Sequence, residues 1–522
     1  MKLFNIKLMF LIACFVFANI TFAQFSVREF DKYVDAVMRS FDVPGISVAI
    51  VKEGKVILAK GYGKKKMGEN IYVDENTLFN IASNTKAFTA TALAILAEEG
   101  KISWDTPVIN YLPWFRLSDP FVTNELTVKD LLVHRSGLGL GAGDLLWWPT
   151  STYDRKDITR RLKFIPLENR FRYTYAYDNV LYLVAGELIE AITDSSWEDF
   201  VYSRILNRVG MKHSRVRVSD ILREINIASP HAKIDGQVRP ITPFTSDNTN
   251  PAGGILSNAQ DMAKWMIVQL DSGRLENGGR LFTPLTTRQL WTIVTPIPIS
   301  EPPPEMVQLR ANFNGYALGF VIRDYLGKKI VSHTGGMPGY VSRVTLVPDI
   351  KLGISILTNQ ESGNAFNALT YFVLDKYLGA KKYDWITQLK KLEQTGDSIN
   401  RSEEKNLATA RDTTSGPSLP ITRYMGKYRD AWYGDVIIML EENKPVIKFL
   451  HTPSLVGDLV HWQYDTFIAM WRDRVLRADA YVTFYIAPDG SIEYVKMRAV
   501  SPETDFSFDF HDLLLKPVHS KE

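Results

Sequence analysis

The chain has 522 residues, which is too long for a single ordinary hydrophobic core, so we expect two or more domains. Apolar residues make up 45% of the sequence and charged residues 23%, the proportions of a soluble globular protein. The formal net charge is only +3 and the chain has no long basic block, which argues against a protein that binds nucleic acid.

Residues 1–23 are typical of a secretory signal peptide. Lys2 and Lys7 precede an apolar run over 8–18, and a small-residue cleavage site puts the mature start near Gln24. The run is short for a membrane-spanning helix, and no later stretch has about 18 uninterrupted apolar residues. We therefore predict a secreted, periplasmic protein with no membrane span in its mature chain.

The single cysteine, Cys14, lies inside this signal, where Leu-Ile-Ala-Cys loosely resembles a lipoprotein processing box. The apolar run continues beyond Cys14, so lipidation is the less favoured alternative. The mature chain then has no disulfide and no cysteine metal ligand. The 8 histidines are scattered without a ligand spacing such as H-E-x-x-H, so we predict no metal and no cofactor.

The mature chain begins with elements typical of a mixed α/β fold. Apolar side chains at helical spacing predict a helix over 27–41. Segments over 46–51 and 55–62 meet at Glu53-Gly54, which is a strong hairpin signal. An alanine-rich helix follows, beginning near Ser83 and closing at Gly100.

Residues 101 to about 300 are mainly helical, and strands return after them. Thr127 to Asp130 resembles a capping box that opens a short helix, and Ser257 is expected to cap a helix through Ile267. Strands near both chain ends predict one antiparallel sheet with a helical domain inserted between them. The remaining predicted elements are a helix over 180–192, strands over 316–323, 329–333, 340–347 and 352–358, and a helix over 364–378.

A connector and a second domain complete the chain. Trp385 and Leu389 lie at helical spacing within 384–412, and a Thr-Thr-Ser-Gly-Pro run predicts a flexible hinge. The following module holds short strands over 436–440, 446–450, 466–471, 481–486 and 492–497, so we predict an all-β barrel or curved sheet that packs near the cleft. The predicted boundaries are 1–23 for the signal peptide, 24–380 for the first domain, 381–419 for the connector and hinge, and 420–522 for the all-β domain.

Ser83 and Lys86 are the first candidates for chemistry. Side chains three positions apart lie on one face of a helix. Ser83 falls in the first turn, where free N–H groups and the helix dipole favour a developing negative charge. Serine is a weak nucleophile, and a desolvated lysine can act as its base. Because Ser-x-x-Lys strings also occur by chance, the surrounding motifs decide the interpretation.

Tyr177 and Asn179 stand just before the predicted helix over 180–192. A free tyrosine ionises near pH 10, but a nearby ammonium favours its anion, so Tyr177 is a candidate general base toward Ser83 or a proton shuttle. Asn179 offers an amide that can orient Lys86 and a substrate carbonyl. The alternative is an ordinary tyrosine and asparagine in a buried turn.

The run His333-Thr334-Gly335-Gly336 ends a predicted strand. Glycines at a strand edge let a substrate backbone approach closely. The N–H groups of Ser83 and Gly336 would then form an oxyanion hole, which is usually a large electrostatic contribution in acyl transfer. The alternative is a glycine-rich hairpin turn.

His134 and Ser136 invite a serine–histidine triad, but residues this close at a helix end do not face each other. We assign their segment to a turn that shapes the wall of the cleft.

Taken in order, these motifs resemble the serine β-lactamase-related hydrolases, which include class C β-lactamases, D-stereospecific peptidases and esterases. The resemblance implies an α/β sandwich with an inserted helical domain and a cleft between them. It also implies an acyl-enzyme on Ser83, with Lys86 and Tyr177 sharing proton transfer, and a substrate positioned by Asn179 and by His333 to Gly336. It covers roughly residues 28–378, through Ser83–Lys86, His134–Leu138, Tyr177–Asn179, Ala252–Gly254 and His333–Gly335.

Two further features refine this expectation. Class C β-lactamases have Lys-Thr-Gly where this chain has His333-Thr334-Gly335, which argues against β-lactam hydrolysis. Arg343 is a possible replacement charge, although its direction cannot be read from the sequence. The segment around Tyr424 to Tyr428 is similar to β-domains of unknown function appended to such hydrolases.

We therefore predict a secreted serine hydrolase that acts on an amide or ester in a small-molecule or peptide substrate. The alternatives are a β-lactamase or D,D-carboxypeptidase, and a catalytically silent protein that binds peptidoglycan or peptides.

Overall fold

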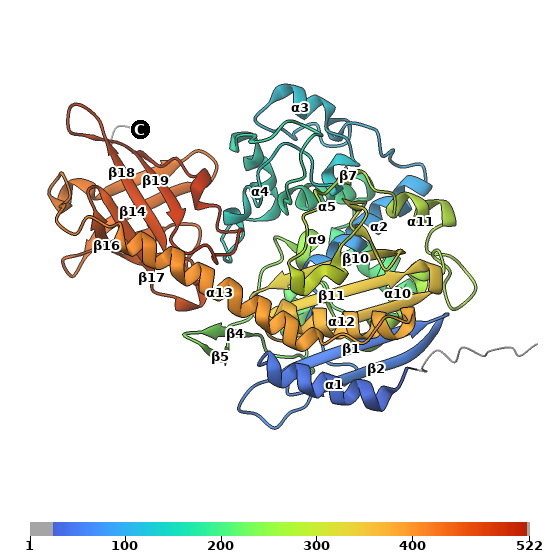
Figure 1. Cartoon of the computed structure of the whole chain (residues 1–522). Helices are drawn as coiled ribbons and strands as arrows, with labels where there is room; N and C mark the ends of the chain where they lie inside the picture. Colours follow the sequence, from blue (N-terminus) through green and yellow to red (C-terminus); the bar gives the residue numbers. More distant parts are fainter. Residues whose placement is uncertain (1–24, 519–522) are drawn as a thin grey trace, which may run out of the picture.

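The computed structural model describes residues 25–518 (Figure 1). The predicted signal peptide, 1–23, lies outside the described residues. Within 25–518, every helix is too short or too polar to cross a membrane.

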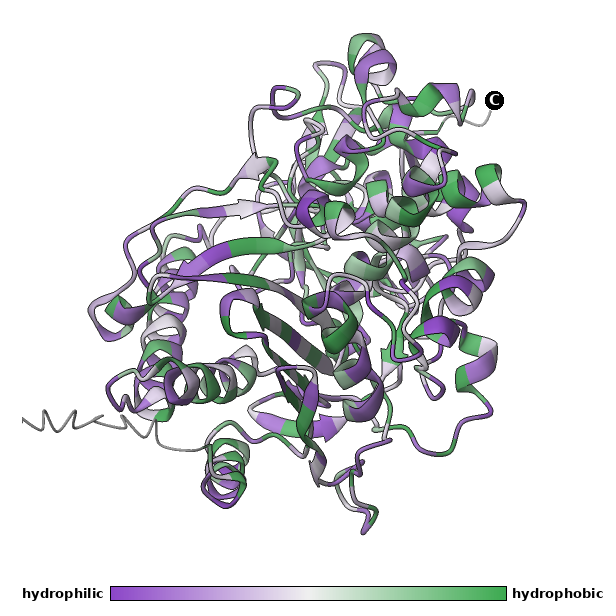
Figure 2. Ribbon diagram, turned by 90° about the vertical axis from the view of Figure 1, so that its right-hand side faces the viewer, coloured by the Kyte–Doolittle hydropathy of each residue, from purple (hydrophilic) through white to green (hydrophobic). Residues whose placement is uncertain are grey.

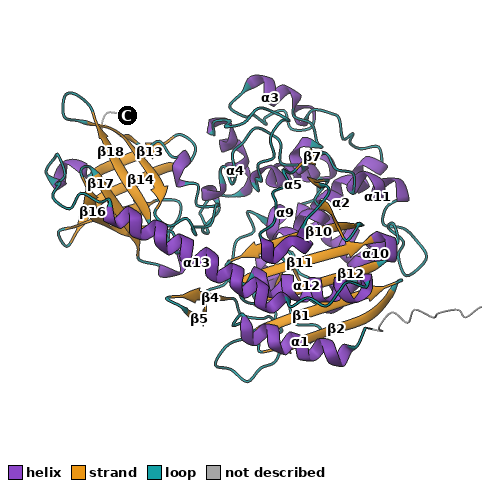
Figure 3. Ribbon diagram, viewed as in Figure 1, coloured by secondary structure: helices purple, strands orange, loops and turns teal. Residues whose placement is uncertain are grey.

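An eight-stranded antiparallel sheet forms the centre of the first domain (Figure 3). Its strand order is β2-β1-β12-β11-β10-β9-β8-β7, so β1 pairs with β2 on one side and, on the other, with β12, which lies about 300 residues later. This arrangement confirms the predicted sheet built from both chain ends. The strands are β1 (Gly45–Lys52), β2 (Lys55–Gly63), β7 (Thr295–Pro296), β8 (Asn314–Tyr316), β9 (Val321–Tyr325), β10 (Lys328–Met337), β11 (Tyr340–Val347) and β12 (Leu352–Thr358).

Helices cover both faces of this sheet. Because side chains alternate along a strand, Val48 and Ile50 face α1 (Val27–Ser40) and α12 (Gly363–Leu378), while Ala49 and Val51 belong to the core on the other face. That second core holds α10 (Ala259–Leu270) and α2 (Thr85–Glu98). The surface helices carry hydrophobic and hydrophilic residues side by side (Figure 2).

Helix α2 is buried from Thr85 to Leu96, which its nearly unbroken run of alanine, threonine and aliphatic residues permits. It lies between the sheet and an inserted helical region, and α5 packs directly against it. Apart from short 3₁₀ and π turns, the other elements of 79–290 are α3 (Pro120–Glu125), α4 (Arg155–Arg161), α5 (Val180–Thr193), α6 (Trp197–Val201), α7 (Asn207–Val209), α8 (Val218–Ile221), α9 (Asn250–Gly253), α11 (Pro284–Leu290), β3 (Phe79–Asn80), β4 (His231–Ile234), β5 (Gln237–Pro240) and β6 (Leu256–Ser257).

Several predicted boundaries are wrong. The predicted strand over 316–323 is two strands, β8 and β9, separated by a turn at Gly319, whose φ is +79°. The segment after Thr127 forms one 3₁₀ turn, although its capping box is present, because Asp130 accepts the Thr127 N–H. Asn258 caps α10 instead of Ser257, which lies in β6.

A long helix, α13 (Trp385–Thr409), leads to the second domain (Figure 1). Trp385 and Leu389 are buried against α12, and the Trp385 indole donates to Asp375. Beyond the helix, Asp412 and Ser415 accept hydrogen bonds from Tyr464, so the predicted hinge segment is held against the barrel.

The second domain is a nearly closed barrel of eight antiparallel strands, which confirms the predicted all-β class. Val495 and Leu515 exchange backbone hydrogen bonds and bring the two ends of the sheet together. The sequence patterns miss β13, β16 and β20. The strands are β13 (Gly426–Asp430), β14 (Gly434–Glu441), β15 (Lys444–Phe449), β16 (Val456–Gln463), β17 (Thr466–Trp471), β18 (Ala480–Ile486), β19 (Ile492–Ala499) and β20 (Lys516–Pro517).

The barrel packs on the helical region of the first domain. The Tyr153 ring stacks on His451 with 4.1 Å between centroids, and Arg161 donates to the Trp432 carbonyl at 3.0 Å. Hydrophobic residues of both domains belong to one continuous core. The two domains therefore share a buried interface.

Candidate active site

Ser83 lies in the short 3₁₀ turn Ala82–Asn84 that leads into α2. The preceding residue, Ala82, has φ +47°, a left-handed conformation that is unfavourable for alanine. A hydrogen bond of 2.6 Å from the Ala82 N–H to the Asn80 side chain holds this turn. As the helical spacing predicts, the Lys86 amine lies 3.1 Å from the Ser83 hydroxyl oxygen.

Lys86 is fully buried, and its amine has three hydrogen-bond partners. Besides Ser83, Nζ contacts Asn179 Oδ1 at 2.7 Å and the Ala252 carbonyl at 3.0 Å. Burial lowers the pKa of Lys86 to about 7, although Asp144 and Asp178 oppose that shift. A neutral amine donates two hydrogen bonds, to the amide and carbonyl oxygens, and its lone pair then faces the serine hydroxyl.

Tyr177 lies beside this amine, with its ring centroid 4.9 Å from Lys86 Nζ. Burial raises the pKa of Tyr177 well above 10, and a hydrogen bond with the Ser83 hydroxyl opposes this shift only in part. The phenol is therefore neutral, contrary to the expectation that a nearby ammonium favours its anion.

Asn179 is held by a carboxylate that the sequence analysis missed. Its Nδ2 donates to Asp144 Oδ2 at 2.8 Å, which leaves Oδ1 facing Lys86. Asp144 is fully buried, and it also accepts from Trp147 at 2.9 Å and from Ser507 at 2.9 Å. Burial raises the pKa of Asp144 to about 7, although these hydrogen bonds oppose the shift. A lone acidic residue before Leu-Leu-Trp-Trp is the one sequence signal that could have found it.

His333 is neutral and fixed by two hydrogen bonds. Its Nδ1 donates to the Thr334 carbonyl at 2.5 Å, so Nε2 accepts from the Tyr316 hydroxyl at 2.7 Å. Burial, together with the charge of Lys86, lowers the pKa of His333 to about 3. Tyr316 is a second side chain of the site that the sequence analysis did not identify.

The run from His333 to Gly336 lies inside β10 and not at its end, which corrects the prediction. Pairing of β10 with β9 stops at Ser332, so the edge from His333 to Met337 is unpaired on that side. A Cβ on Gly335 would lie 2.3 Å from the Ile81 carbonyl oxygen and 2.9 Å from the Ser83 nitrogen. Only glycine allows the strand to pack this closely against the turn that carries Ser83.

Arg343 points away from the site. It lies opposite Thr334 in the register of β10 and β11, and its guanidinium donates to Asn367 and stacks 5.3 Å from the Tyr371 ring. Both partners belong to α12, which covers the other face of the sheet. Arg343 therefore supplies no charge to replace a lysine at His333.

His134 supports Tyr177 from behind. Its ring lies 4.2 Å from the Tyr177 ring, and its Nδ1 accepts the Asp178 N–H at 3.2 Å. Burial lowers the pKa of His134, so it is a neutral residue of the cleft wall.

A cavity of about 320 Å³ lies in front of Ser83. It opens toward a groove of about 1100 Å³ between the two domains, and Trp148, Gly336, Met337 and Asp505 line both. The cavity brings together residues of both domains: Ser83, Tyr175, Tyr177, Asn179, Gly253, Tyr316, His333, Thr334, Gly335, Gly336, Asp505, Phe506 and Ser507. All the predicted site residues except the buried Lys86 thus line one cavity, and a loop of the barrel, 505–507, forms part of its wall.

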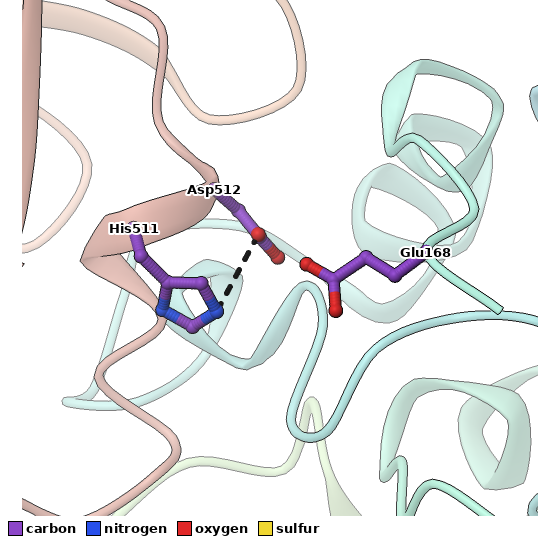
Figure 4. A group of neighbouring side chains, drawn as sticks. All are labelled: Glu168, His511 and Asp512. Atoms are coloured by element: carbon purple, nitrogen blue, oxygen red, sulfur yellow. Dashed lines mark ion pairs between the residues drawn. The ribbon is translucent and has the colours of Figure 1, made fainter.

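One group of side chains in the described part of the chain has the spacing of metal ligands (Figure 4). Glu168 of the first domain faces His511 and Asp512 of the barrel, with ligand atoms within 4.8 Å of one another. Asp512 lies 3.5 Å from His511, and burial raises the pKa of Asp512 to about 6. Glu168 and His511 are exposed, and exposed groups of this kind are common without an ion, so we assign no metal to them.

The fold and the site define a protein of the β-lactamase and transpeptidase class. The Beta-lactamase family model matches residues 30–377, and the chain belongs to this family. A domain of unknown function, DUF3471, matches residues 410–517. The chain is a hydrolase of the family, as the predicted resemblance implied.

Known proteins resemble the chain over most of its length. It is 28% identical over 440 residues to the unguisins hydrolase ungD′ of Aspergillus campestris, covering 80% of this chain and 79% of that protein. The octameric penicillin-binding protein homologue of Pyrococcus abyssi has a TM-score of 0.60 at 20% identity, over 94% of this chain and 100% of that one. The D-amino acid amidase of Ochrobactrum anthropi SV3 has a TM-score of 0.55 at 20% identity, covering 67% of this chain and 100% of that one.

Proposed function

We propose that the protein hydrolyses an amide or ester through an acyl-enzyme on Ser83. The observation that carries this proposal is the buried amine of Lys86, 3.1 Å from the Ser83 hydroxyl and with a pKa near 7. Lys86 accepts the hydroxyl proton as Ser83 attacks the substrate carbonyl. The N–H groups of Ser83 and Gly336 would stabilise the tetrahedral oxyanion.

Tyr177 acts in this scheme as a neutral proton relay. Because its pKa is far above neutral, the phenol is protonated at neutral pH, so it can act on the leaving group only by giving up its proton while it takes one from Lys86. The proton that Lys86 takes from Ser83 returns through Tyr177 to the leaving amine or alkoxide. Water then attacks the acyl-enzyme, with Lys86 again as the base.

The substrate is a peptide-like amide or an ester without a carboxylate next to the reacting carbonyl. His333 is neutral and Arg343 points away, so the described residues that line the cavity include no lysine or arginine to bind such a group. The adjoining groove is large enough for several residues of a peptide. The name of one structural neighbour, a D-amino acid amidase, supports an amide substrate.

The proposal that the protein is exported rests on the sequence of residues 1–23 alone. Their charged start, apolar run and small-residue end support secretion into the periplasm with cleavage near Gln24. N-terminal sequencing of the protein purified from a periplasmic fraction would test this proposal.

Burst kinetics test the acyl-enzyme. Rapid mixing with a p-nitrophenyl ester should release about one equivalent of nitrophenolate per active site before the slower steady state. An active wild type that shows no burst, and no acyl adduct in the intact mass of the rapidly quenched protein, would reject the intermediate.

A further inference from the structure

We propose that the barrel is part of the catalytic machinery, because Ser507 positions Lys86 through Asp144 and Asn179. This inference rests on the proposed function and assigns a role to the domain of unknown function. Ser507 is a positioning residue and takes no part in bond making.

Three hydrogen bonds connect Ser507 to the catalytic amine. The Ser507 hydroxyl donates to Asp144 Oδ2 at 2.9 Å, and the same oxygen accepts from Asn179 Nδ2 at 2.8 Å. The other end of that amide, Oδ1, lies 2.7 Å from Lys86 Nζ. All four side chains are buried, so water competes little for these bonds and each bond is strong.

The orientation of the Asn179 amide decides what Lys86 can do. With Nδ2 on the Asp144 carboxylate, Oδ1 accepts a hydrogen bond from the amine and leaves its lone pair for Ser83. A reversed amide would place N–H groups against the amine and occupy that lone pair. The carboxylate of Asp144 therefore keeps Lys86 available as a base.

The barrel holds Asp144 from two sides. The Ser507 hydroxyl is one of three donors to its carboxylate, with Asn179 and Trp147. Asp509, two residues further along the same loop, accepts the N–H groups of Gly143 and Leu145 at 2.7 and 3.0 Å. The loop thus fixes both the side chain of Asp144 and the backbone turn that carries it.

The charge of the Asp144 carboxylate links this hydrogen-bond network to the pKa of Lys86. Asp144 and Asp178 raise the pKa of Lys86, and the Ser507 hydrogen bond lowers the pKa of Asp144. Without that bond Asp144 is less ionised near neutral pH, so Lys86 loses part of the charge that raises its pKa. The other titratable groups near Lys86 are Tyr177, Tyr182, His134 and His333, and the other titratable group near Asp144 is Asp509.

The test compares Ser507→Ala with the wild type in the full chain, using a small p-nitrophenyl ester. Loss of one hydrogen bond to a buried charge should lower kcat roughly ten- to hundredfold with a smaller change in KM. The acidic limb of kcat/KM should also move to lower pH, which a merely structural role would not cause. Ser491→Ala is the matched control, since it removes a serine–aspartate bond of 2.6 Å at a distant hairpin of the same barrel.

The pair Ser507→Thr and Ser507→Val keeps the test valid if Ser507→Ala folds poorly. These two side chains have the same shape and differ in the hydroxyl, so the threonine variant should be the more active by tenfold or more. The inference would be overturned if the threonine and valine variants had the same kcat and the same acidic limb. It would also be overturned if Ser507→Ala matched an active wild type in both. An inactive wild type would instead count against the proposed function.

Discussion

The hydroxyl of Tyr316 donates to Nε2 of His333 at 2.7 Å, and the opposite ring nitrogen donates to the Thr334 carbonyl. With both nitrogens engaged in this way the imidazole carries one proton and no charge. Burial strengthens this state by lowering the pKa of His333 to about 3. The position that holds a lysine in class C β-lactamases is therefore electrically neutral in this protein.

This neutrality predicts the order of substrates. A lost charge contact in a semi-buried site costs roughly 1.5–3 kcal/mol, or about ten- to hundredfold in kcat/KM. Near pH 7.5 we expect kcat/KM for a p-nitrophenyl short-chain ester or a D-amino-acid anilide to exceed that for a chromogenic cephalosporin. A kcat/KM for the cephalosporin that exceeds those for the ester and the anilide by about tenfold or more would identify a true β-lactamase.

The pH profile should have an acidic limb near 7. Lys86 acts as a base only when it is deprotonated, so kcat/KM falls about tenfold per pH unit below its pKa of about 7. Because burial also raises the pKa of Asp144 and Asp178 to about 7, this limb belongs to the coupled group. A limb near 10, the range of a free lysine, would show that Lys86 is not desolvated in solution.

Lys86 and Tyr177 should behave as one proton-transfer unit. Lys86→Ala and Tyr177→Phe are each expected to lower kcat about a hundredfold or more, because each interrupts the same proton path. The double variant should be little worse than either single one. If the two losses instead multiply in steady-state kinetics, the two residues act independently.

Phe506 should set the size of the acyl group. Its ring projects from the barrel loop into the cavity, 6.2 Å from the Tyr177 ring, and its edge packs against Gly141. Phe506→Ala should raise kcat/KM for a bulky acyl ester relative to an acetate by roughly tenfold. Phe121→Ala, on the exposed surface of α3, is the control and should leave the ratio unchanged. An unchanged ratio in Phe506→Ala would show that the loop does not limit the substrate.

Local patterns were sufficient to predict the contact of Ser83 with Lys86, because the geometry of a helix alone brings side chains three positions apart onto one face. The pair of Asp144 and Ser507 could not be predicted, because 363 residues separate them and neither lies in a recognisable motif. Their contact depends on how the barrel packs on the first domain.

The direction of the Tyr177 pKa shift was also beyond the sequence. Lys86 could be inferred from the motifs as a neighbour of Tyr177, but the burial that holds the pKa of Tyr177 well above 10 could not. The direction of Arg343 likewise depends on which face of β11 meets the cleft.

The fold was predictable where the pattern is strong. Short runs rich in β-branched and aliphatic residues between turn residues define β11 and β12 to the residue. By contrast, β16 (Val456–Gln463) mixes polar and apolar residues on a small barrel and gives no clear period. Gly319 divides β8 from β9 because the chain must turn there against α2, where a Cβ would lie 2.8 Å from the Lys86 carbonyl oxygen. A single glycine inside an apolar run is the local sign of this tertiary constraint, and it does not show what the chain turns against.

The most direct test of the account is the intact mass of the protein after treatment with a fluorophosphonate. The Ser83 oxygen should displace fluoride from phosphorus, so the wild type should gain the mass of one phosphonyl group, and peptide mapping should place it on Ser83. Ser83→Ala should remain unlabelled with an unchanged melting temperature. An equal adduct on Ser83→Ala, or none on an active wild type, would contradict Ser83 as the nucleophile.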